Sequence, residues 1–178
     1  MKKLYLVRHG ECVANVEGVV AGGANDSPLT EKGKEQAKDT VKLLAGLGFQ
    51  AIIASTLSRA KDTADIIADG FNWSEGVETD MRIRELNVGD ATGIPLDEYF
   101  KLEAGGKPIP NAETLEEMYA RTADFISDIR QRPEKEFLIV SHNGAGRMIR
   151  NVASGGDVAS FHTVPNQHNG EIIEVVLD

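Results

Sequence analysis

The sequence has a single cysteine, Cys12, among its 178 residues, so no disulfide can form within the chain and no all-cysteine metal site can be assembled. It also has no apolar run close to the ~18 residues that a membrane span requires. The first apolar run, residues 4–7, is too short for the core of a secretory signal. These absences favour a cytoplasmic protein that makes no contact with a membrane.

Positive charge is scarce as well. The chain has 19 Lys and Arg against 28 Asp and Glu, which gives a net charge of −9. Nonspecific nucleic-acid binding depends on clustered Lys and Arg, so we expect no nucleic-acid partner, and any bound phosphate needs a local basic pocket. At roughly 150 residues per domain, the length corresponds to a single domain over residues 1–178.

Hydrophobic periodicity alternates between short strands and longer helices along the chain. Strands are predicted at residues 4–7, 51–54, 137–140 and 172–177, with a weaker one at 81–86, and helices at 30–45, 58–69, 114–130 and 144–153. A stretch rich in Gly and Pro lies between these elements, and within it we expect Gly93 to Pro110 to form a lid or insertion with a short helix at 96–103. This order predicts a three-layer α/β sandwich with a mostly parallel central sheet flanked by helices.

Polar side chains follow three of the predicted strands. Arg8 and His9 follow the first strand, Ser55 and Arg59 follow the second, and His142 follows the strand at 137–140. Ligands of parallel sheets bind at the carboxyl ends of strands. One histidine at such a place is often an ordinary surface residue, but two with nearby arginines indicate a shared site. A neutral imidazole can attack phosphorus while guanidinium groups neutralise the phosphoryl oxygens.

Short motifs in a fixed order resemble the histidine phosphatase superfamily, which is also called phosphoglycerate-mutase-like. They are Arg8-His9-Gly10-Glu11 with Asn15, Pro28 to Gly33 with Gln36-Ala37, Ser55 to Ala60 with Thr63-Ala64, Arg84-Glu85-Leu86 with Gly89, Glu113-Thr114 with Arg121, Val140-Ser141-His142, and Asn166. Each motif alone is weak, but together they span essentially the whole chain. The resemblance is to a short, phosphatase-type member with the phosphoglycerate-mutase-like fold.

The resemblance implies a metal-independent reaction through a phosphohistidine. His9 would attack phosphorus, Arg8, Arg59 and His142 would surround the transferring phosphoryl group, and Glu85 would donate a proton to the leaving group. Phosphoryl transfer requires positioning and charge neutralisation, and these residues can supply both without a metal or other cofactor.

Three further residues are candidate substrate-binding positions. Asn15 and Thr63 match positions that frame the phosphate pocket in the family, although both are also ordinary residues for a loop and a helix. Asn143 stands where the family more often has Gly, and it could contact the substrate. Cys12 stands where Ser or Thr is frequent in relatives, and we expect it to be a packing residue.

Two other interpretations concern the same residues. His9, Glu85 and His142 could form a metal site with two histidines and one carboxylate, but the neighbouring Arg8 would repel a divalent cation. Glu85 could instead form a surface ion pair with Arg82 or Arg84, an interaction that contributes only about 0 to 1 kcal/mol.

The family core supports both phosphatases and mutases, and the sequence favours a phosphatase. Only 27 residues separate Glu85 from Glu113, whereas the related sugar-phosphate mutases have larger lids. The loops at 18–27 and 93–110 would contact the rest of the substrate. Lys101 and Lys107 could meet a second anionic group there, although exposed loop lysines are usually only solvated.

The expected partner is a small phosphorylated substrate, and a phosphoprotein is possible. A phosphoglycerate-mutase type of transfer and a catalytically silent phosphate-binding module are the alternatives. A silent module is disfavoured because all the positions expected to act on phosphorus hold competent residues. The apolar stripes fit burial within one chain, and both a monomer and a dimer stay open.

Overall fold

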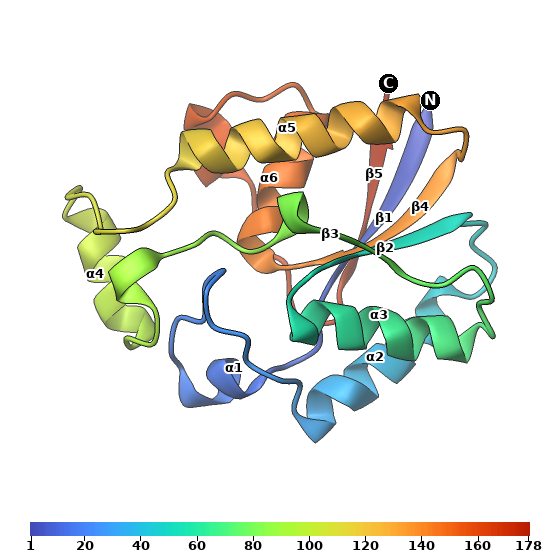
Figure 1. The fold of residues 1–178 in the computed structure, drawn as a ribbon, viewed down its shortest axis with the longest axis horizontal. Helices are drawn as coiled ribbons and strands as arrows, with labels where there is room; N and C mark the ends of the chain where they lie inside the picture. Colours follow the sequence, from blue (N-terminus) through green and yellow to red (C-terminus); the bar gives the residue numbers. More distant parts are fainter.

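The computed structural model describes residues 1–178 and has one five-stranded sheet in the order β3-β2-β4-β1-β5 (Figure 1). The strands are β1 (Lys2–Arg8), β2 (Ala51–Ser55), β3 (Glu78–Asp80), β4 (Glu136–Ser141) and β5 (Ile172–Leu177). All ladders are parallel except that between β1 and β5. The predicted α/β class with a mostly parallel sheet is therefore confirmed. No helix of the structure combines the length and the apolar character needed to cross a membrane.

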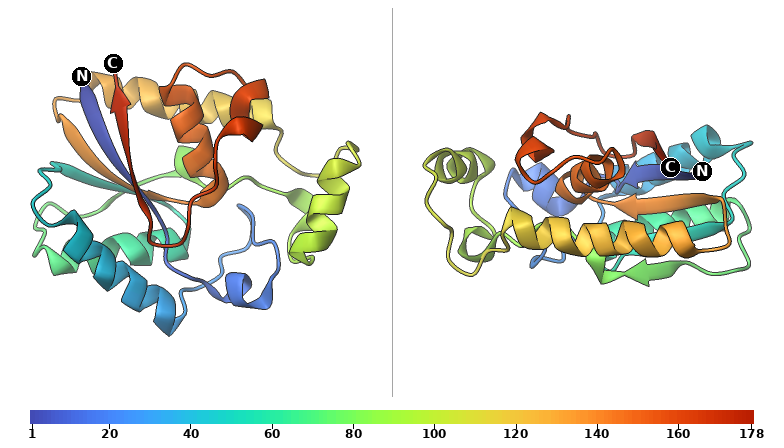
Figure 2. Two further views of the ribbon diagram at one scale, coloured as in Figure 1. Left: turned by 180° about the vertical axis from the view of Figure 1, so that it is seen from behind. Right: turned by 90° about the horizontal axis from the view of Figure 1, so that it is seen from above.

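Two pairs of helices cover the two faces of the sheet (Figures 1 and 2). Helices α2 (Glu31–Leu44) and α3 (Ser58–Gly70) pack on one face, and α5 (Leu115–Gln131) and α6 (Asn143–Ala153) on the other. Successive strand residues point to opposite faces. In β1, Leu4 and Leu6 accordingly join a core of 18 buried residues with α5 and α6. Tyr5 and Val7 join a second core of 12 buried residues with α2 and α3.

Two of the predicted helices begin at capped residues. The side chain of Thr30 accepts a hydrogen bond from the amide of Gly33 at the start of α2. Thr114 and Glu117 form a reciprocal capping box at the start of α5. Each cap satisfies amides that have no partner within the first helical turn. These helices agree with the predicted ranges.

The sequence-based prediction is wrong between residues 81 and 86, where a strand was expected. Strand β3 ends at Asp80, and a 3-10 helix, η1 (Met81–Ile83), follows. The Asp80 carboxylate accepts a hydrogen bond from the amide of Arg82 at 2.8 Å, which turns the chain out of the sheet. The apparent alternation arises because Ile83 is buried while its neighbours are charged. The short helix α1 (Val13–Glu17) was not predicted, since five residues are too few to show a period.

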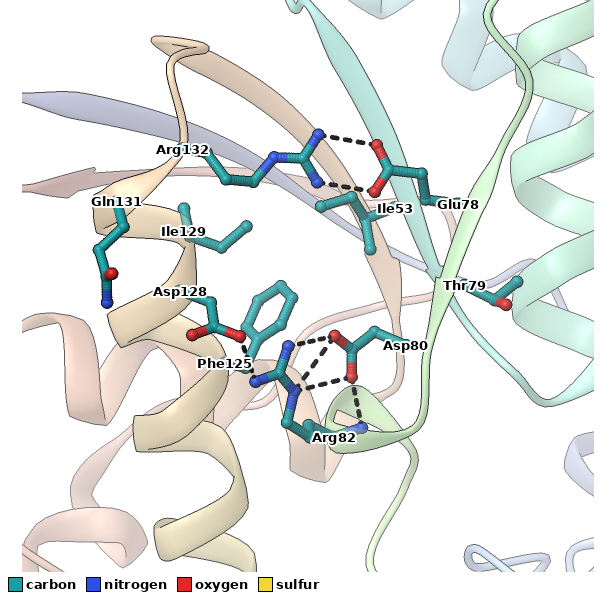
Figure 3. Close-up of a pocket in the computed structure, with 10 residues that line it drawn as sticks. All are labelled: Ile53, Glu78, Thr79, Asp80, Arg82, Phe125, Asp128, Ile129, Gln131 and Arg132. Carbon is teal, nitrogen blue, oxygen red and sulfur yellow. Dashed lines mark hydrogen bonds and ion pairs between the residues drawn. The ribbon is translucent and has the colours of Figure 1, made fainter.

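The edge of the sheet at β3 is tied to α5 by ion pairs (Figure 3). The Arg132 guanidinium holds both carboxylate oxygens of Glu78, at 2.7 and 2.8 Å. Arg82 pairs with Asp80 and also with Asp124 and Asp128 on α5. The guanidinium of Arg82 is thereby paired with three aspartates, and it forms no ion pair with Glu85.

Residues Gly93 to Pro110, here called the cap segment, contain α4 (Leu96–Ala104) at the end of the molecule far from the termini (Figures 1 and 2). Backbone hydrogen bonds join this segment to the loop before α2, with Val20 donating to Ile94 and Leu96 donating to Gly18, both at 2.9 Å. Two further 3-10 helices, η2 (Gly89–Ala91) and η3 (Ala159–Thr163), complete the fold. The two loops that sequence analysis assigned to the substrate are therefore in contact.

Candidate active site

The register of the parallel strands brings the two histidines together. Arg8 of β1 is paired with Ser141 of β4, so His9 and His142 leave the sheet side by side. Their ring centroids are 5.1 Å apart. Strand β2 lies on the other side of β4 and places Ser55 next to His142. The candidate site is thus at the carboxyl ends of three neighbouring strands.

His9 is buried, with 4% of its surface exposed, and is held in one orientation. Its Nδ1 lies 2.7 Å from the Gly10 carbonyl oxygen, so Nδ1 carries the proton and the lone pair is on Nε2. That lone pair accepts a hydrogen bond from Arg59 Nε at 3.3 Å. Burial, and then the positive charges of Arg59 and Arg8, lower the pKa of His9 from 6.5 to about 3. His9 is therefore a neutral imidazole at physiological pH.

Two guanidinium groups converge on this region from different elements. Arg59, on the first turn of α3, is 2% exposed, and it donates to the carbonyl oxygens of Gly22 and Asn25, both at 2.9 Å. Arg8 donates from Nη1 to the Gln167 carbonyl oxygen at 2.6 Å, while its buried Nε has no hydrogen-bond partner. Burial lowers the pKa of both arginines, which nevertheless stay charged. Together they make this part of the cavity basic in an otherwise acidic chain.

His142 is oriented by a serine hydroxyl. Ser55 Oγ accepts from the Leu57 amide at 3.3 Å and lies within hydrogen-bond distance, 2.7 Å, of His142 Nε2. Burial, and then the charge of Arg59, hold the pKa of His142 well below its usual 6.5, so the ring is neutral. With Ser55 as the donor to Nε2, the proton of the ring is on Nδ1. Nδ1 is buried without a partner. An unpaired buried donor costs about 1 to 3 kcal/mol, and a phosphoryl oxygen would satisfy it.

The carboxylate of Glu85 is bound at the N-terminus of α6. It accepts hydrogen bonds from the amides of Gly144 and Ala145, both at 3.0 Å, and from its own neighbour Leu86. Backbone amides and the helix dipole favour an anion at this end of a helix. Gly144 permits the contact because a β-carbon there would lie 2.4 Å from Glu85 Oε1. The side chain of Glu85 is therefore fixed by backbone amides rather than by an arginine.

The arginines near Glu85 in sequence do not pair with its carboxylate. Arg84 donates to the Gly23 carbonyl oxygen at 2.6 Å. Arg121, on α5, forms an ion pair with Glu113 and also donates to the backbone oxygen of Glu85 at 3.5 Å. The interpretation of Glu85 as half of a surface ion pair is consequently wrong.

Most of the side chains predicted for the site line one cavity of about 320 Å³. Of the residues that sequence analysis assigned to the site, it exposes Arg8, His9, Asn15, Arg59, Glu85 and Asn143. Asn15 Oδ1 accepts from the amide of buried Cys12 at 3.1 Å. Asn143 donates to Asn166 Oδ1 at 3.0 Å and accepts from the Gln167 amide at 2.9 Å.

Thr63 and His142 are buried and are not among the residues that line the cavity, although the His142 ring adjoins that of His9. The Thr63 hydroxyl is fully buried, accepts from the Gly10 amide at 3.1 Å, and donates to the Arg59 carbonyl oxygen at 2.7 Å. It thus links the backbone of the His9 motif to that of Arg59. This geometry favours a positioning role for Thr63 over the substrate contact expected from sequence.

Sequence analysis missed the role of Gln167. Its backbone oxygen accepts from Arg8, and its buried side-chain amide donates to the backbone oxygens of Leu6 and Glu171, at 2.9 and 2.8 Å. Gln167 therefore fixes Arg8 to the end of β1. Nothing in a polar stretch such as Pro165 to Gly170 marks one glutamine as buried, so no sequence signal was available.

The alternative metal site is disfavoured by the same contacts. Nε2 of His9 faces Arg59, and Nε2 of His142 is engaged by Ser55. The side chains of His, Cys, Asp and Glu nowhere gather in a group of three that could hold a metal ion.

The fold is α/β, and the site brings a neutral histidine and two buried arginines together at the carboxyl ends of neighbouring strands. The model of the histidine phosphatase superfamily (branch 1) matches residues 4–178, and the chain belongs to this family. It is 37% identical to a protein named uncharacterized phosphatase PhoE from Bacillus subtilis (strain 168), over 88% of this chain and 80% of that protein.

Two other similarities cover most of the chain. It is 36% identical to the probable phosphoglycerate mutase GpmB of Enterobacter sp. (strain 638), over 80% of this chain and 70% of that protein. The solved structure of Bacillus stearothermophilus YhfR superposes with a TM-score of 0.86 at 28% identity and covers 100% of this chain and 92% of that one. The relatives thus carry the names of both phosphatases and mutases.

Proposed function

We propose that this protein hydrolyses a phosphomonoester through a phosphohistidine intermediate on His9. The observation that carries the proposal is the buried, neutral His9 ring, whose Nε2 lone pair lies beside the Arg59 guanidinium. In the first step Nε2 forms a bond to phosphorus and the bond from phosphorus to the ester oxygen breaks. Arg8, Arg59 and the Nδ1 proton of His142 stabilise the charge on the phosphoryl oxygens.

Glu85 completes both steps as acid and then base. Its protonated carboxyl gives a proton to the leaving oxygen, so the product is a neutral alcohol. In the second step the carboxylate takes a proton from water as the water oxygen attacks phosphorus. Inorganic phosphate leaves, and His9 returns to its neutral form. The amides of Gly144 and Ala145 position the side chain, and they favour the carboxylate form that acts as the base in the second step.

Hydrolysis is favoured over mutase chemistry because the segment that covers the cavity is short. A single helix of nine residues, α4, covers the cavity. A mutase must keep the dephosphorylated product bound and exclude water until the phosphoryl group returns. The short cap segment supports transfer to water instead.

The proposed substrate is a small phosphate ester, and a phosphoprotein is the less favoured alternative because a side chain must enter beneath α4. We place the protein in the cytoplasm, since its only cysteine is a free thiol packed in the interior. No metal or other cofactor enters the proposed reaction.

The test measures phosphate release from p-nitrophenyl phosphate and a panel of small esters with a chelator present. The matched variants are His9→Ala and, as a control, His168→Ala, which changes an exposed histidine outside the cavity. Rapid acid and alkaline quenching should also detect an intermediate that is stable in alkali and labile in acid. We expect turnover and intermediate to disappear in His9→Ala only.

Turnover that survives in His9→Ala would refute the mechanism. Transfer of the phosphoryl group between positions of 3-phosphoglycerate, with little free phosphate, would identify a mutase. A parent protein that binds phosphate but turns over no ester would identify a silent binding module.

A further inference from the structure

Beyond the phosphoryl group, the wall of the cavity is apolar. Val20 and Val88 form its floor together with the buried rings of Tyr99 and Phe161, and Leu96 and Phe100 line its mouth. Leu96 and Phe100 of α4 are 39% and 58% exposed. Large apolar side chains exposed around a cavity mark a binding surface for an apolar group.

The charged groups in this part of the cavity compensate one another. Glu103 accepts a hydrogen bond from the Tyr99 hydroxyl at 3.1 Å and opposes the charge of Arg147. Arg147 donates to the backbone oxygens of Val164 and Phe161 and stacks 4.4 Å from the Phe161 ring centroid. Two nitrogens of its guanidinium are therefore engaged by the backbone, and the carboxylate of Glu103 offsets its charge.

Apart from Arg8, Arg59 and Arg147, whose charge Glu103 offsets, no Lys or Arg lines the cavity to meet a second anionic group of the substrate. Lys101 forms an exposed pair with Asp97 at 2.9 Å, and neither Lys101 nor Lys107 lines the cavity. The two lysines considered in the sequence analysis thus lie outside the site. A second phosphate or carboxylate would instead meet the carboxylate of Glu103 and the apolar floor.

The volume of the cavity is sufficient for one ring and one phosphoryl group. An apolar cavity of about 150 Å³ accommodates a benzene molecule. The cavity here measures about 320 Å³, including the part between the arginines and Glu85.

Building on the proposed function, we propose that the substrate is a phosphate monoester with an apolar, ring-sized leaving group and no second anionic group. Phe100 and Leu96 bind the apolar part, and Glu103 selects against doubly anionic molecules such as phosphoglycerates and bisphosphates. The residues that act on phosphorus contact the phosphoryl group that every ester has. The preference among esters therefore depends on the cap segment.

The experiment compares the binding of benzylphosphonate and 3-phosphonopropionate to the whole protein by calorimetry, so that no turnover is needed. The kinetic counterpart is kcat/KM for benzyl phosphate against ethyl phosphate, whose alcohols are leaving groups of similar basicity. We expect a preference of about tenfold or more for the benzyl compound in each pair, since even one methylene in an apolar pocket is worth roughly 10- to 200-fold.

Phe100→Ala should reduce the benzyl preference to about a fifth or less, because the variant loses the ring that covers the apolar group. The control, Leu102→Ala, changes an exposed apolar residue of the same helix that does not line the cavity. It should retain the preference. Glu103→Gln should raise the affinity for 3-phosphonopropionate relative to benzylphosphonate, because the repulsion between two anions is removed.

Equal or tighter binding of 3-phosphonopropionate by the parent would overturn the inference, and so would an unchanged benzyl preference in Phe100→Ala. If phosphate release depends on His9 but shows no such preference, the proposed phosphatase stands and the inference fails. If benzylphosphonate binds with the expected preference but no ester is hydrolysed, the proposed phosphatase fails and the apolar site stands.

Discussion

Replacing Gly144 by alanine should separate the role of Glu85 from the rest of the site. A β-carbon at position 144 would lie 2.4 Å from Glu85 Oε1, and ordinary contact begins at about 3.4 Å. The carboxylate must therefore move by about 1 Å, while the backbone of α6 keeps its place against α5 and the sheet. That movement breaks the hydrogen bonds from the amides of Gly144 and Ala145.

The expected effect on catalysis is large and selective. A misplacement of about 1 Å in a catalytic group can cost about 100-fold in rate. An alkoxide leaving group needs the proton of Glu85, whereas nitrophenolate is stable without it. Formation of the phosphohistidine should therefore slow about 100-fold with benzyl phosphate and less than about 10-fold with p-nitrophenyl phosphate. The free energy of unfolding should fall by only about 1 to 2 kcal/mol, because the loss of two hydrogen bonds is partly offset by the better helix propensity of alanine.

Single-turnover release of benzyl alcohol or nitrophenol measures the first step alone. The matched control is Gly48→Ala, where the nearest atom to the new β-carbon is 3.7 Å away and belongs to the flexible Glu136 side chain. The reasoning is refuted if Gly144→Ala releases benzyl alcohol at the parent rate. An equal loss with both esters would show a general distortion of the site instead of a displaced acid.

Three further predictions concern orientation, packing and pH. Ser55→Ala removes the hydroxyl that contacts His142 and should lower the single-turnover rate constant about 10-fold. Its circular dichroism spectrum should be like that of the parent. Gly33→Ala places a β-carbon 2.0 Å from the Glu11 carbonyl oxygen. It should lower the free energy of unfolding by about 2 to 3 kcal/mol in urea titrations. A urea midpoint like that of the parent would contradict this prediction. Because burial lowers the pKa values of His9 and His142, the unfolded chain binds more protons than the folded one below pH about 6.5. Stability should thus fall as pH drops from about 6.5 towards 4, by up to about 1.4 kcal/mol per pH unit for each histidine, and His9→Gln should reduce that slope.

Much of the site could be predicted because its residues are next to strongly apolar strands. Runs such as 51–54 and 137–140 are buried on both faces in a parallel sheet, and their continuous apolar character shows where each strand ends. Since the carboxyl ends of parallel strands share one edge, polar residues just beyond them must lie near one another. The meeting of His9, Arg59 and His142 follows from this rule.

Other parts of the site depend on relations that a one-dimensional pattern does not contain. The position of Glu85 relative to α6 depends on a carboxylate binding amides about 60 residues away, and only the absent side chain at Gly144 hints at it. The turn after Asp80 depends on one side chain bonding to the local backbone, which replaces the strand that the alternating pattern suggested. Gln167 is buried through hydrogen bonds to backbone oxygens, for which any polar residue of the loop would have looked equally suitable.

The groups proposed to act on phosphorus and those proposed to contact the leaving group belong to different parts of the fold. This difference explains why the reaction was easier to predict than the substrate. His9 and His142 follow adjacent strands, and Glu85 is bound to the helix after β4, so the groups acting on phosphorus are fixed by the sheet and its core. The leaving group instead faces α4, which joins the loop after α1 through a few backbone hydrogen bonds and the small cluster around Val20. Changes in α4 can therefore alter which alcohol is bound without moving the catalytic groups. If this is correct, exchanging the apolar residues at the mouth of the cavity should change KM and the preference among esters, while single-turnover phosphorylation of His9 at saturating substrate stays close to that of the parent.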